Sequence, residues 1–264
     1  MAGVSARWRV AFAMHRGAPA RQQDAVLVGV EVWQEDRLAP QEALTETDVL
    51  AALADGVATS PSAQFASRFV LKTLPRVIAE HPQWLQEGYV AARHVRETQA
   101  RLAAELARRP GLRGSSCTLV AAHFLAGHVV VLNSGDSRAY LRRRDGSVQQ
   151  LSRDHTELQR MIDPGEADAT TEYASIYDAL SDCLIADPHE GGFSIHRAET
   201  RLQDGDAVIL CTDGVHDVLG EAAWRKQMEA LADPFPLVQA THEAVLKAGA
   251  PDNFSLVVVR AEFR

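Results

Sequence analysis

The sequence predicts an α+β fold in which β-sheets and α-helices form separate layers. Short apolar runs typical of strands occur in both halves of the chain, and stretches with helical periodicity lie in pairs between them. The 264 residues are 46% hydrophobic and 23% charged, which provides enough apolar sequence to bury a full core. We therefore expect one layered α+β domain that spans residues 1–264.

The first part of the chain is expected to contain three strands. Weak alternation predicts a strand from Trp8 to Met14, and apolar runs predict strands from Ala25 to Trp33 and from Val49 to Ala54. The acidic stretch from Gln34 to Asp48 lies between the second and the third strand, and we expect it to form a loop.

Two helices should follow these strands. The first spans Pro61 to His81, where apolar residues fall on one helical face and Pro75 is expected to bend or interrupt the helix. The second spans Gln83 to Arg109 and is closed by Pro110 and Gly111. The apolar stripe of the second helix is expected to face the core and consists of Leu85, Tyr89, Ala92, Val95, Leu102 and Leu106.

The middle of the chain is rich in predicted strands. Short apolar runs are expected to pair as an antiparallel meander, with a hairpin turn at Arg144 to Ser147. From Thr156 to Gly192 the periodicity fades among acidic, Gly and Pro residues, which predicts a partly helical, mobile segment. The four predicted strands are Ser116 to Phe124, His128 to Ser134, Arg138 to Arg143 and Ser147 to Leu151.

The last third of the chain returns to regular structure. Its predicted strands are Phe193 to His196, Ala207 to Cys211 and Phe254 to Glu262, and its predicted helices are Glu221 to Leu231 and Pro236 to Ala248.

Charge and cysteine content exclude some classes of function. The formal net charge is -8 and the pI is about 5.7, whereas nucleic-acid binding needs a basic surface. The apolar stretch from Val10 to Met14 is too short for a signal peptide or a membrane span. Three cysteines lie in apolar sequence, which predicts buried thiols in a reducing compartment. We therefore expect a cytoplasmic protein that binds neither nucleic acid nor a membrane. The cysteines are Cys117, Cys183 and Cys211.

Aspartates recur where predicted strands meet loops. Asp-Gly or Gly-Asp pairs follow three apolar runs, and two further aspartates precede apolar runs. A single Asp-Gly pair indicates only a turn. Five carboxylates at strand ends would repel one another strongly without a cation, so the set predicts a metal site. The five residues are Asp24, Asp55, Asp136, Asp213 and Asp252.

The residue types at these positions favour a hard cation. Oxygen ligands without clustered Cys or His residues suit Mn²⁺ or Mg²⁺ better than Zn²⁺. Two such ions about 3.5–4 Å apart would share a carboxylate and a hydroxide that attacks phosphorus in line with the leaving oxygen. This chemistry suits phosphoester hydrolysis without a covalent enzyme intermediate. The sequence has no Gly-rich phosphate loop ending in Lys-Ser or Lys-Thr, no His-Glu-x-x-His and no Gly-x-Ser-x-Gly.

Six motifs occur in order along the chain. They are Arg16 to Ala25, Leu53 to Val57, Gly135 to Tyr140, Leu151 to His155, Cys211 to Val215 and Asp252 to Ser255. Together they resemble the metal-dependent type 2C (PPM) protein serine/threonine phosphatases, in particular their bacterial branch. The resemblance covers nearly the whole chain. It implies a sandwich of two antiparallel β-sheets flanked by pairs of α-helices, in α-β-β-α layers, with metals in a cleft at one end and a variable flap at about residues 156–192.

The resemblance implies catalytic roles for four aspartates. Asp55 corresponds to the carboxylate that bridges two metals, and the carbonyl of Gly56 corresponds to a ligand of one of them. Asp213 and Asp252 correspond to ligands of the other metal. Asp24 corresponds to a carboxylate that holds metal-bound water.

Three neighbouring positions are implied to support the site. Asp136 resembles the residue that, with Asp213, holds a weaker third metal. Gln23 stands where family members usually carry Glu, and because the amide has no charge, we expect one metal to bind more weakly. Asn253 is expected to orient Asp252 through a hydrogen bond.

Some positions depart from the family pattern. The arginine that binds substrate phosphate in many members would fall near Pro19 here. Arg16 and Arg21 are the candidates to replace it, and each is explained equally well as a surface residue. Val57 stands where some relatives have a histidine general acid, so we expect metal-bound water to protonate the leaving oxygen. His155 is expected to cap a turn.

These features together predict a phosphoprotein phosphatase. It would use two or three Mn²⁺ or Mg²⁺ ions to hydrolyse phosphoserine and phosphothreonine, and it would oppose a bacterial Ser/Thr kinase. The alternative is a low-activity or non-catalytic module on the same fold that binds phosphoproteins; the four retained inner ligand positions favour activity. A metal-dependent nuclease is disfavoured by the acidic balance. The acidic flap further predicts substrates with basic flanks.

Overall fold

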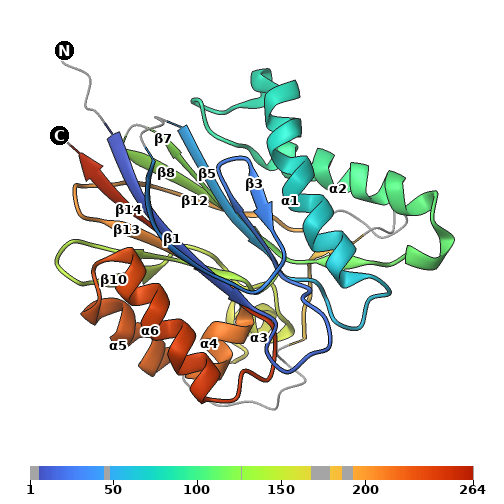
Figure 1. Ribbon diagram of the computed structural model, residues 1–264. Helices are drawn as coiled ribbons and strands as arrows, with labels where there is room; N and C mark the ends of the chain where they lie inside the picture. Colours follow the sequence, from blue (N-terminus) through green and yellow to red (C-terminus); the bar gives the residue numbers. More distant parts are fainter. Residues whose placement is uncertain (1–5, 45–47, 126, 168–178, 186–192, 264) are drawn as a thin grey trace.

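Two antiparallel β-sheets face each other at the centre of the molecule, and helices cover the outer face of each sheet (Figure 1). The computed structural model describes residues 6–44, 48–125, 127–167, 179–185 and 193–263. The α+β class and the predicted α-β-β-α layers are confirmed by this arrangement.

The first sheet carries both chain ends as neighbouring strands. It has six strands among the described residues, and neighbouring strands are antiparallel. In spatial order these are β10 (Val148–Gln150), β9 (Arg138–Arg142), β13 (Ala207–Cys211), β14 (Phe254–Phe263), β1 (Ala6–His15) and β4 (Arg37–Leu44).

The second sheet also has six antiparallel strands in the described part of the chain. In spatial order these are β12 (His196–Arg201), β8 (His128–Ser134), β7 (Leu119–Leu125), β5 (Asp48–Ala54), β2 (Ala25–Val28) and β3 (Glu31–Trp33). Two short strands, β6 (Ser116–Cys117) and β11 (Leu184–Ile185), pair with each other beside it.

The helices form two layers and one short connection. Helices α1 (Ala63–Glu80) and α2 (Ala92–Ala107) pack on the second sheet, and α4 (Asp213–Leu219), α5 (Glu221–Ala230) and α6 (Pro234–Lys247) pack on the first. The short α3 (Glu157–Ile162) lies with α4 at the end of the sandwich where β1 ends (Figure 1). Single 3₁₀ turns span Pro82–Trp84 and Pro110–Leu112. Helix α1 continues through Pro75, so the proline does not interrupt it.

Alternation along the strands divides the apolar residues between the interior of the sandwich and its outer faces. In β1 the large side chains point between the sheets, whereas Ala11 and Ala13 belong to the cluster under α6. Small outward residues let the helix lie close to the strand. The inward residues of β1 are Trp8, Val10, Phe12 and Met14.

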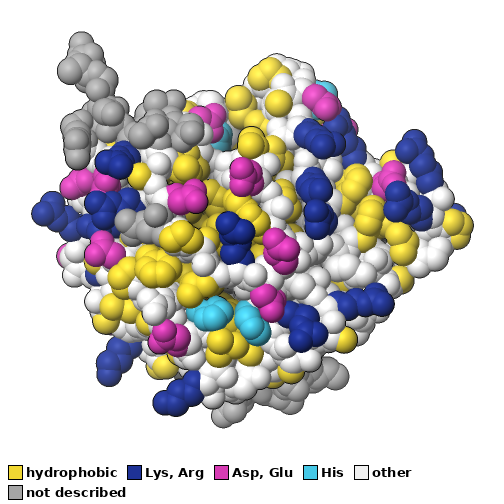
Figure 2. Space-filling model, in the orientation of Figure 1, with side chains coloured by type: hydrophobic (Ala, Val, Ile, Leu, Met, Phe, Trp, Pro, Cys, Tyr) yellow, Lys and Arg dark blue, Asp and Glu magenta, His cyan; other side chains and the backbone are white. Residues whose placement is uncertain are grey.

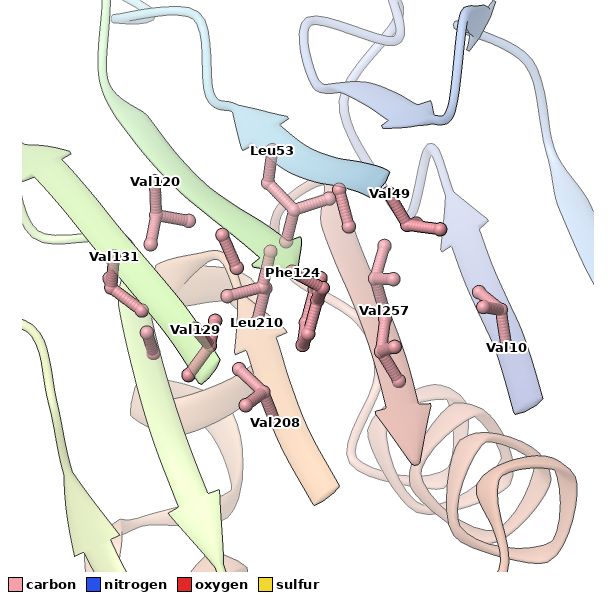
Figure 3. Close-up of a cluster of buried hydrophobic side chains, with 14 of the residues drawn as sticks. Val10, Val49, Leu53, Val120, Phe124, Val129, Val131, Val208, Leu210 and Val257 are labelled. Atoms are coloured by element: carbon pink, nitrogen blue, oxygen red, sulfur yellow. The ribbon is translucent and has the colours of Figure 1, made fainter. Parts of the chain in front are cut away.

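The interior of the sandwich is filled with hydrocarbon. Phe124 lies at its centre, fully buried, with its ring centroid 5.1 Å from that of Trp8. Figure 3 shows side chains of β1, β5, β7, β8, β13 and β14 converging on this region. The labelled residues are Val10, Val49, Leu53, Val120, Phe124, Val129, Val131, Val208, Leu210 and Val257. This packed interior fixes where each strand ends.

One predicted loop is wrong. The acidic stretch between Gln34 and Asp48 contains β4, which pairs with β1 at the edge of the first sheet. An edge strand has one side open to solvent, so it accepts polar residues and also Pro40, which lacks an N–H group. The pairing register shifts between Val10 and Phe12, opposite that proline. The strand therefore lacks the alternation by which strands are predicted.

The single strand predicted from Ala25 to Trp33 is two strands, β2 and β3, joined by a turn. Gly29 in this turn has a φ of +63° and ends the first strand. The pattern did not show the break because Val30, an apolar residue, occupies the exposed tip.

The second predicted helix begins later than its apolar residues indicated. Helix α2 starts at Ala92 rather than at Gln83, and an isolated bridge pairs Gln86 with Tyr89 before it. Gly88 between these two has a φ of +91°, which a right-handed helix does not allow. The later part of the predicted stripe is buried as expected and consists of Val95, Leu102 and Leu106.

The predicted meander is divided between the two sheets. Strands β7 and β8 pair in the second sheet, whereas β9 and β10 pair in the first, because the chain crosses between the sheets after Ser134. Strand β12 begins at His196, where the strand predicted from Phe193 was expected to end. Its sequence alternates with many polar residues, which suits a strand at the edge of a sheet. Helix α4 was not predicted; seven residues are too few for a clear period.

The predicted flap is described only in part. Helix α3 and strand β11 belong to it, while residues 168–178 and 186–192 lie outside the described residues. The three cysteines are buried, as expected. Among the described helices, none has the length and apolar character that crossing a membrane requires. On the face shown in Figure 2, acidic and basic side chains are interspersed rather than gathered into one basic surface.

Phe124→Ala is expected to lower the free energy of unfolding by about 3–5 kcal/mol, because it leaves a cavity between the sheets that neighbouring strands cannot close. Phe124→Leu, which keeps most of the volume, should lose clearly less. Urea unfolding followed by circular dichroism measures both. A loss below about 1 kcal/mol for the alanine variant would contradict the central position of this ring.

Candidate metal centre

The predicted aspartates gather at one end of the sandwich. In antiparallel pairs the end of one strand lies beside the start of its neighbour, so the ends of β5 and β13 meet the starts of β2 and β14. Asp55 and Asp213 follow the first two strands, and Asp24 and Asp252 precede the other two. Asp136 lies in the turn after β8, at the same end.

A cavity of about 180 Å³ lies between these loops. The part of its wall that is described has four carboxylates and no Lys or Arg side chain. Its lining residues are Gln23, Asp55, Gly56, Val57, Ala58, Thr118, Asp136, Leu180, Asp213 and Asp252. Four of the five predicted aspartates, with Gln23 and Gly56, therefore share one cavity, and Asp24 lies in the protein next to it.

Asp24 is fully buried and is held on one side by two hydroxyl groups. Thr212 and Ser255 donate hydrogen bonds to its Oδ2, at 3.0 Å and 2.7 Å. Its Oδ1 has no hydrogen-bond partner among the described residues. The pKa of Asp24 is raised to about 7: burial is the largest cause, the charge of Asp213 adds to it, and the hydrogen bonds from Ser255 and Thr212 oppose it. A buried carboxylate oxygen without a partner fits a nearby cation or a cation-bound water.

Asp213 is the charge that acts on all the other aspartates of the site. Burial is the largest cause of the raised pKa of Asp55, which lies well above its usual range, and Asp213 is the next. Burial and Asp213 raise the pKa of Asp136 to about 7. The pKa of Asp252 is also raised, first by burial and to a lesser degree by Asp213. A divalent cation would reverse this balance by favouring the charged forms.

Two glycines allow the backbone segments to approach one another. A Cβ atom on Gly214 would lie 2.0 Å from the carbonyl oxygen of Asn253, so only glycine lets α4 start against the loop before β14. A Cβ atom on Gly56 would lie 2.7 Å from the backbone of Ala63 at the start of α1. The Asp-Gly pairs are thus sites of close backbone packing, which places Asp213 near the Asp252 loop.

The segment that carries Asp55 is fixed by short strand β6 and by Thr118. The backbone N–H of Asp55 donates to the hydroxyl of Thr118 at 3.1 Å, and its carbonyl accepts from the Thr118 N–H at 2.7 Å. Gly56 lies opposite Cys117 in a bridge whose hydrogen bonds come from the flanking residues. In such a pair the opposed residues turn their own carbonyls outward, so the Gly56 carbonyl points away from β6.

The hydrogen bond expected between Asn253 and Asp252 is present, but the backbone of Asn253 donates it. Its side chain does not bond to the carboxylate of Asp252, which instead accepts from the backbone N–H of Asn253 at 2.7 Å. The Asn253 side chain holds the loop before β2: its Oδ1 accepts from the N–H of Gln23 at 2.6 Å, and its Nδ2 donates to the carbonyls of Arg16 and Arg21. An amide can donate and accept at once, and a carboxylate in this place could not.

The candidate phosphate ligands lie on this loop but do not line the described cavity. The guanidinium of Arg16 donates to the carbonyl of Ala20 at 3.3 Å, so it is engaged within its own loop. Arg21 is exposed. The predicted capping role of His155 agrees with the structure, because its Nδ1 accepts from the N–H of Gly135 at 3.0 Å.

The donor set fits Mn²⁺ or Mg²⁺. No three His, Cys, Asp or Glu side chains of the described residues are arranged to surround one ion. Magnesium-like ions are commonly held by one or two carboxylates and keep several waters, so the spread of Asp55, Asp213 and Asp252 around a cavity suits them. A site for Zn²⁺ would need a tighter group of His or Cys ligands.

Three hydroxyl groups that position the aspartates were not predicted from the sequence. Thr212 and Ser255 hold Asp24, and Thr118 holds the backbone of Asp55. Two of them stand next to the aspartate motifs, Thr212 directly before Asp213 and Ser255 three residues after Asp252. That proximity was the available signal.

The sequence of this chain is similar to those of known phosphatases. The sequence profile of the family described as protein phosphatase 2C matches residues 15–249. The serine/threonine protein phosphatase PstP of Mycobacterium tuberculosis is 31% identical over 220 residues, which are 79% of this chain and 40% of that protein. The serine/threonine phosphatase stp of Listeria innocua is 30% identical over 151 residues, 56% of this chain and 58% of that protein. The chain thus spans less than two thirds of the length of these relatives.

A solved structure agrees with the sequence comparison. The crystal structure of the Mycobacterium tuberculosis serine/threonine phosphatase PstP/Ppp superposes with a TM-score of 0.77 at 25% identity, covering 97% of this chain and 99% of that one. The match therefore includes both sheets, their helices and the end of the sandwich where the aspartates gather. The chain belongs to the protein phosphatase 2C family, as the order of its aspartate motifs predicted.

Proposed function

We propose that this protein is a Mn²⁺- or Mg²⁺-dependent phosphatase that hydrolyses phosphoserine and phosphothreonine in proteins and opposes a Ser/Thr protein kinase. The observation that carries the proposal is the convergence of four aspartates on one cavity, with an unpartnered oxygen of buried Asp24 beside it. Relatives of the chain are named serine/threonine phosphatases, which favours activity over a non-catalytic binding module. A cytoplasmic location belongs to the same proposal.

The metal roles that the family resemblance implies are part of this proposal, and the shared cavity supports them. A solved structure of the catalytic domain of PstP holds 2 manganese ions. In this chain, two ions would be held by Asp55, the carbonyl of Gly56, Asp213 and Asp252, a third by Asp136 with Asp213, and bound water by Asp24 and Gln23. When bound, the ions would neutralise the carboxylates and lower the pKa of a water molecule so that it can attack phosphorus.

The residues of the chain would then orient the bound water and bind the phosphate group of the substrate. Thr212 and Ser255 fix Asp24 in one rotamer, so its second oxygen is always directed away from them. Arg21 is the better candidate for the substrate phosphate, because the guanidinium of Arg16 is bonded to Ala20 and the Arg21 backbone is held by Asn253. Val57 lines the cavity and cannot donate a proton, so the leaving oxygen would take its proton from water.

Asp213→Asn is expected to lower Mn²⁺-dependent hydrolysis of a phosphothreonine peptide by at least roughly a hundredfold, since it removes the charge that acts on every other carboxylate. Released phosphate is the measurement. Glu229→Gln, on the exposed part of α5, removes a charge elsewhere and should keep the activity. Equal activity of the wild type with and without a chelator would contradict the metal requirement.

Asp24→Asn is expected to raise the melting temperature of the chelator-treated protein at pH 8 and to reduce the further rise that Mn²⁺ causes. The pKa of Asp24 is raised from 3.8 to about 7, so the wild type loses stability as the pH rises from 3.8 through about 7. Removing the carboxylate should recover on the order of 3 kcal/mol above pH 7 and less at pH 5. Thermal unfolding with chelator and with Mn²⁺ measures both effects; identical curves at pH 8 in chelator would oppose them.

Thr212→Val is expected to weaken Mn²⁺ binding by about tenfold, because Asp24 loses a donor and can leave its rotamer. The substitution should also lower the free energy of unfolding by about 1–3 kcal/mol, since the buried N–H of Ser255 loses its acceptor. Thr98→Val removes an equally buried hydroxyl, bonded to the carbonyl of His94 in α2, and is the matched control. Calorimetric titration with Mn²⁺ should separate the two variants; equal affinities would refute the positioning role.

A further inference from the structure

A second cavity continues from the metal centre between α3 and the α4–α5 pair. Its volume is about 500 Å³, and it shares Asp136 and Asp213 with the smaller cavity, so a chain segment lying in it would reach the centre directly. We call it the flap groove. Its lining residues are Asp136, Arg138, Gln150, Asp154, Thr156, Leu158, Gln159, Ile162, Asp213, His216, Asp217 and Glu221.

One wall of the flap groove is a row of carboxylates that leads away from the centre. Asp213, Asp217 and Glu221 line it at intervals of four residues, which puts Asp217 one helical turn beyond Asp213. The Asp217 side chain is 67% exposed, and the described group nearest to its carboxylate is Nδ1 of buried His216, at 2.8 Å.

The other charged residues of the groove neutralise one another. The guanidinium of Arg138 contacts the Asp154 carboxylate with both Nε and Nη2, at 2.9 Å and 2.6 Å. Glu221 lies 3.3 Å from Arg138 and 3.0 Å from Arg225. Outside the metal centre, Asp217 is therefore the carboxylate of this wall that has no ion pair with a Lys or Arg side chain among the described residues.

The opposite wall is apolar. Helix α3 has no buried residue, and its Leu158 and Ile162, one turn apart, line the groove rather than a core. The hydroxyl of Thr156 accepts from the N–H of Gln159 at 3.2 Å and caps the helix start.

The described acidic residues of the flap do not supply the negative charge of the groove. Glu157 pairs with Arg160 at 3.2 Å, and Asp163 pairs with Arg153. Neither Glu157 nor Asp163 is among the residues that line the flap groove. The charge that a substrate would meet there comes from α4 instead.

We infer that the flap groove binds the substrate chain beside the phosphorylated residue and selects a segment with one basic and one apolar side chain. This inference rests on the proposed function. The basic side chain contacts Asp217, and the apolar one contacts Leu158 and Ile162. Because an extended chain advances about 3.3 Å per residue and one helical turn is about 5.4 Å, the basic residue lies about two positions from the phosphorylated one.

The test uses three peptides that are identical except at one residue, which lies two positions from the phosphorylated threonine. This residue is Arg, Gln or Glu. A hydrolysis series carries the phosphate, and a binding series carries its phosphonate analogue, which cannot be cleaved. Fluorescence anisotropy with the Mn²⁺-loaded protein gives the Kd of the second series. We expect the Arg peptide to bind roughly three- to tenfold more tightly than the Glu peptide, and the difference should shrink in high salt.

Variants locate the preference. Asp217→Asn should remove the difference between the Arg and Glu peptides, and Asp217→Lys should reverse it. Glu229→Gln removes a carboxylate of α5 outside the groove and should preserve the difference. Leu158→Ser with Ile162→Ser should abolish the gain in affinity from a Leu placed next to the phosphorylated residue, while the Arg preference persists.

The outcomes distinguish the inference from the proposed function. Hydrolysis of all three peptides with equal Kd values would overturn the inference and leave the phosphatase activity intact. An Arg preference that depends on Asp217, without hydrolysis of any peptide, would overturn the activity and support the groove. A preference that survives Asp217→Lys would place the recognition elsewhere and overturn the inference.

Discussion

Mutual repulsion among carboxylates that are held in an apolar frame is the constraint on which this structure depends. The sandwich interior is hydrocarbon, and its strands cannot shift without leaving voids. The loops at one end therefore hold Asp55, Asp136 and Asp252 near Asp213, where burial and like charge oppose the ionisation of these three. The free energy of packing in the sheets holds together a group of charges that would separate in a flexible chain. A divalent cation is the natural partner for such a group.

The means of holding these charges are small and local. Gly214 and Gly56 let backbone segments touch. The hydroxyl groups of Thr212 and Ser255 donate hydrogen bonds to one oxygen of Asp24 and leave its other oxygen free to bind. Thr212 stands at the N-cap position of α4, but its hydroxyl donates to Asp24 instead of capping the helix. The start of the helix loses a side-chain cap, and the metal centre gains a fixed carboxylate.

Much of this architecture was predictable because it rests on residue patterns. Strands with apolar faces, such as β5 and β13, were predicted at their observed ends, and the aspartates after them were placed at one site. Strand β4 was missed because an edge strand does not need alternation, and the start of α2 was misplaced because Gly88 outweighs an apolar stripe. The side-chain contacts of Asn253 were not predicted because its partners lie about 230 residues away along the sequence. Patterns report local geometry, and such a contact exists only in the folded chain.

The hydrogen bonds of Asn253 and Asp24 also bear on the order of folding. Gln23 and Asn253 are separated by 230 positions, and Asp24 and Ser255 by 231, so the centre depends on contacts between segments that lie far apart in the sequence. During synthesis the loop before β2 emerges early, yet its acceptor and the hydroxyl that orients Asp24 arrive only with β14. Contacts of such long separation form late. Because β14 lies between β13 and β1, its arrival would join the two parts of the first sheet and supply the last groups of the metal centre together, so the ability to bind metal would mark the completion of the sandwich.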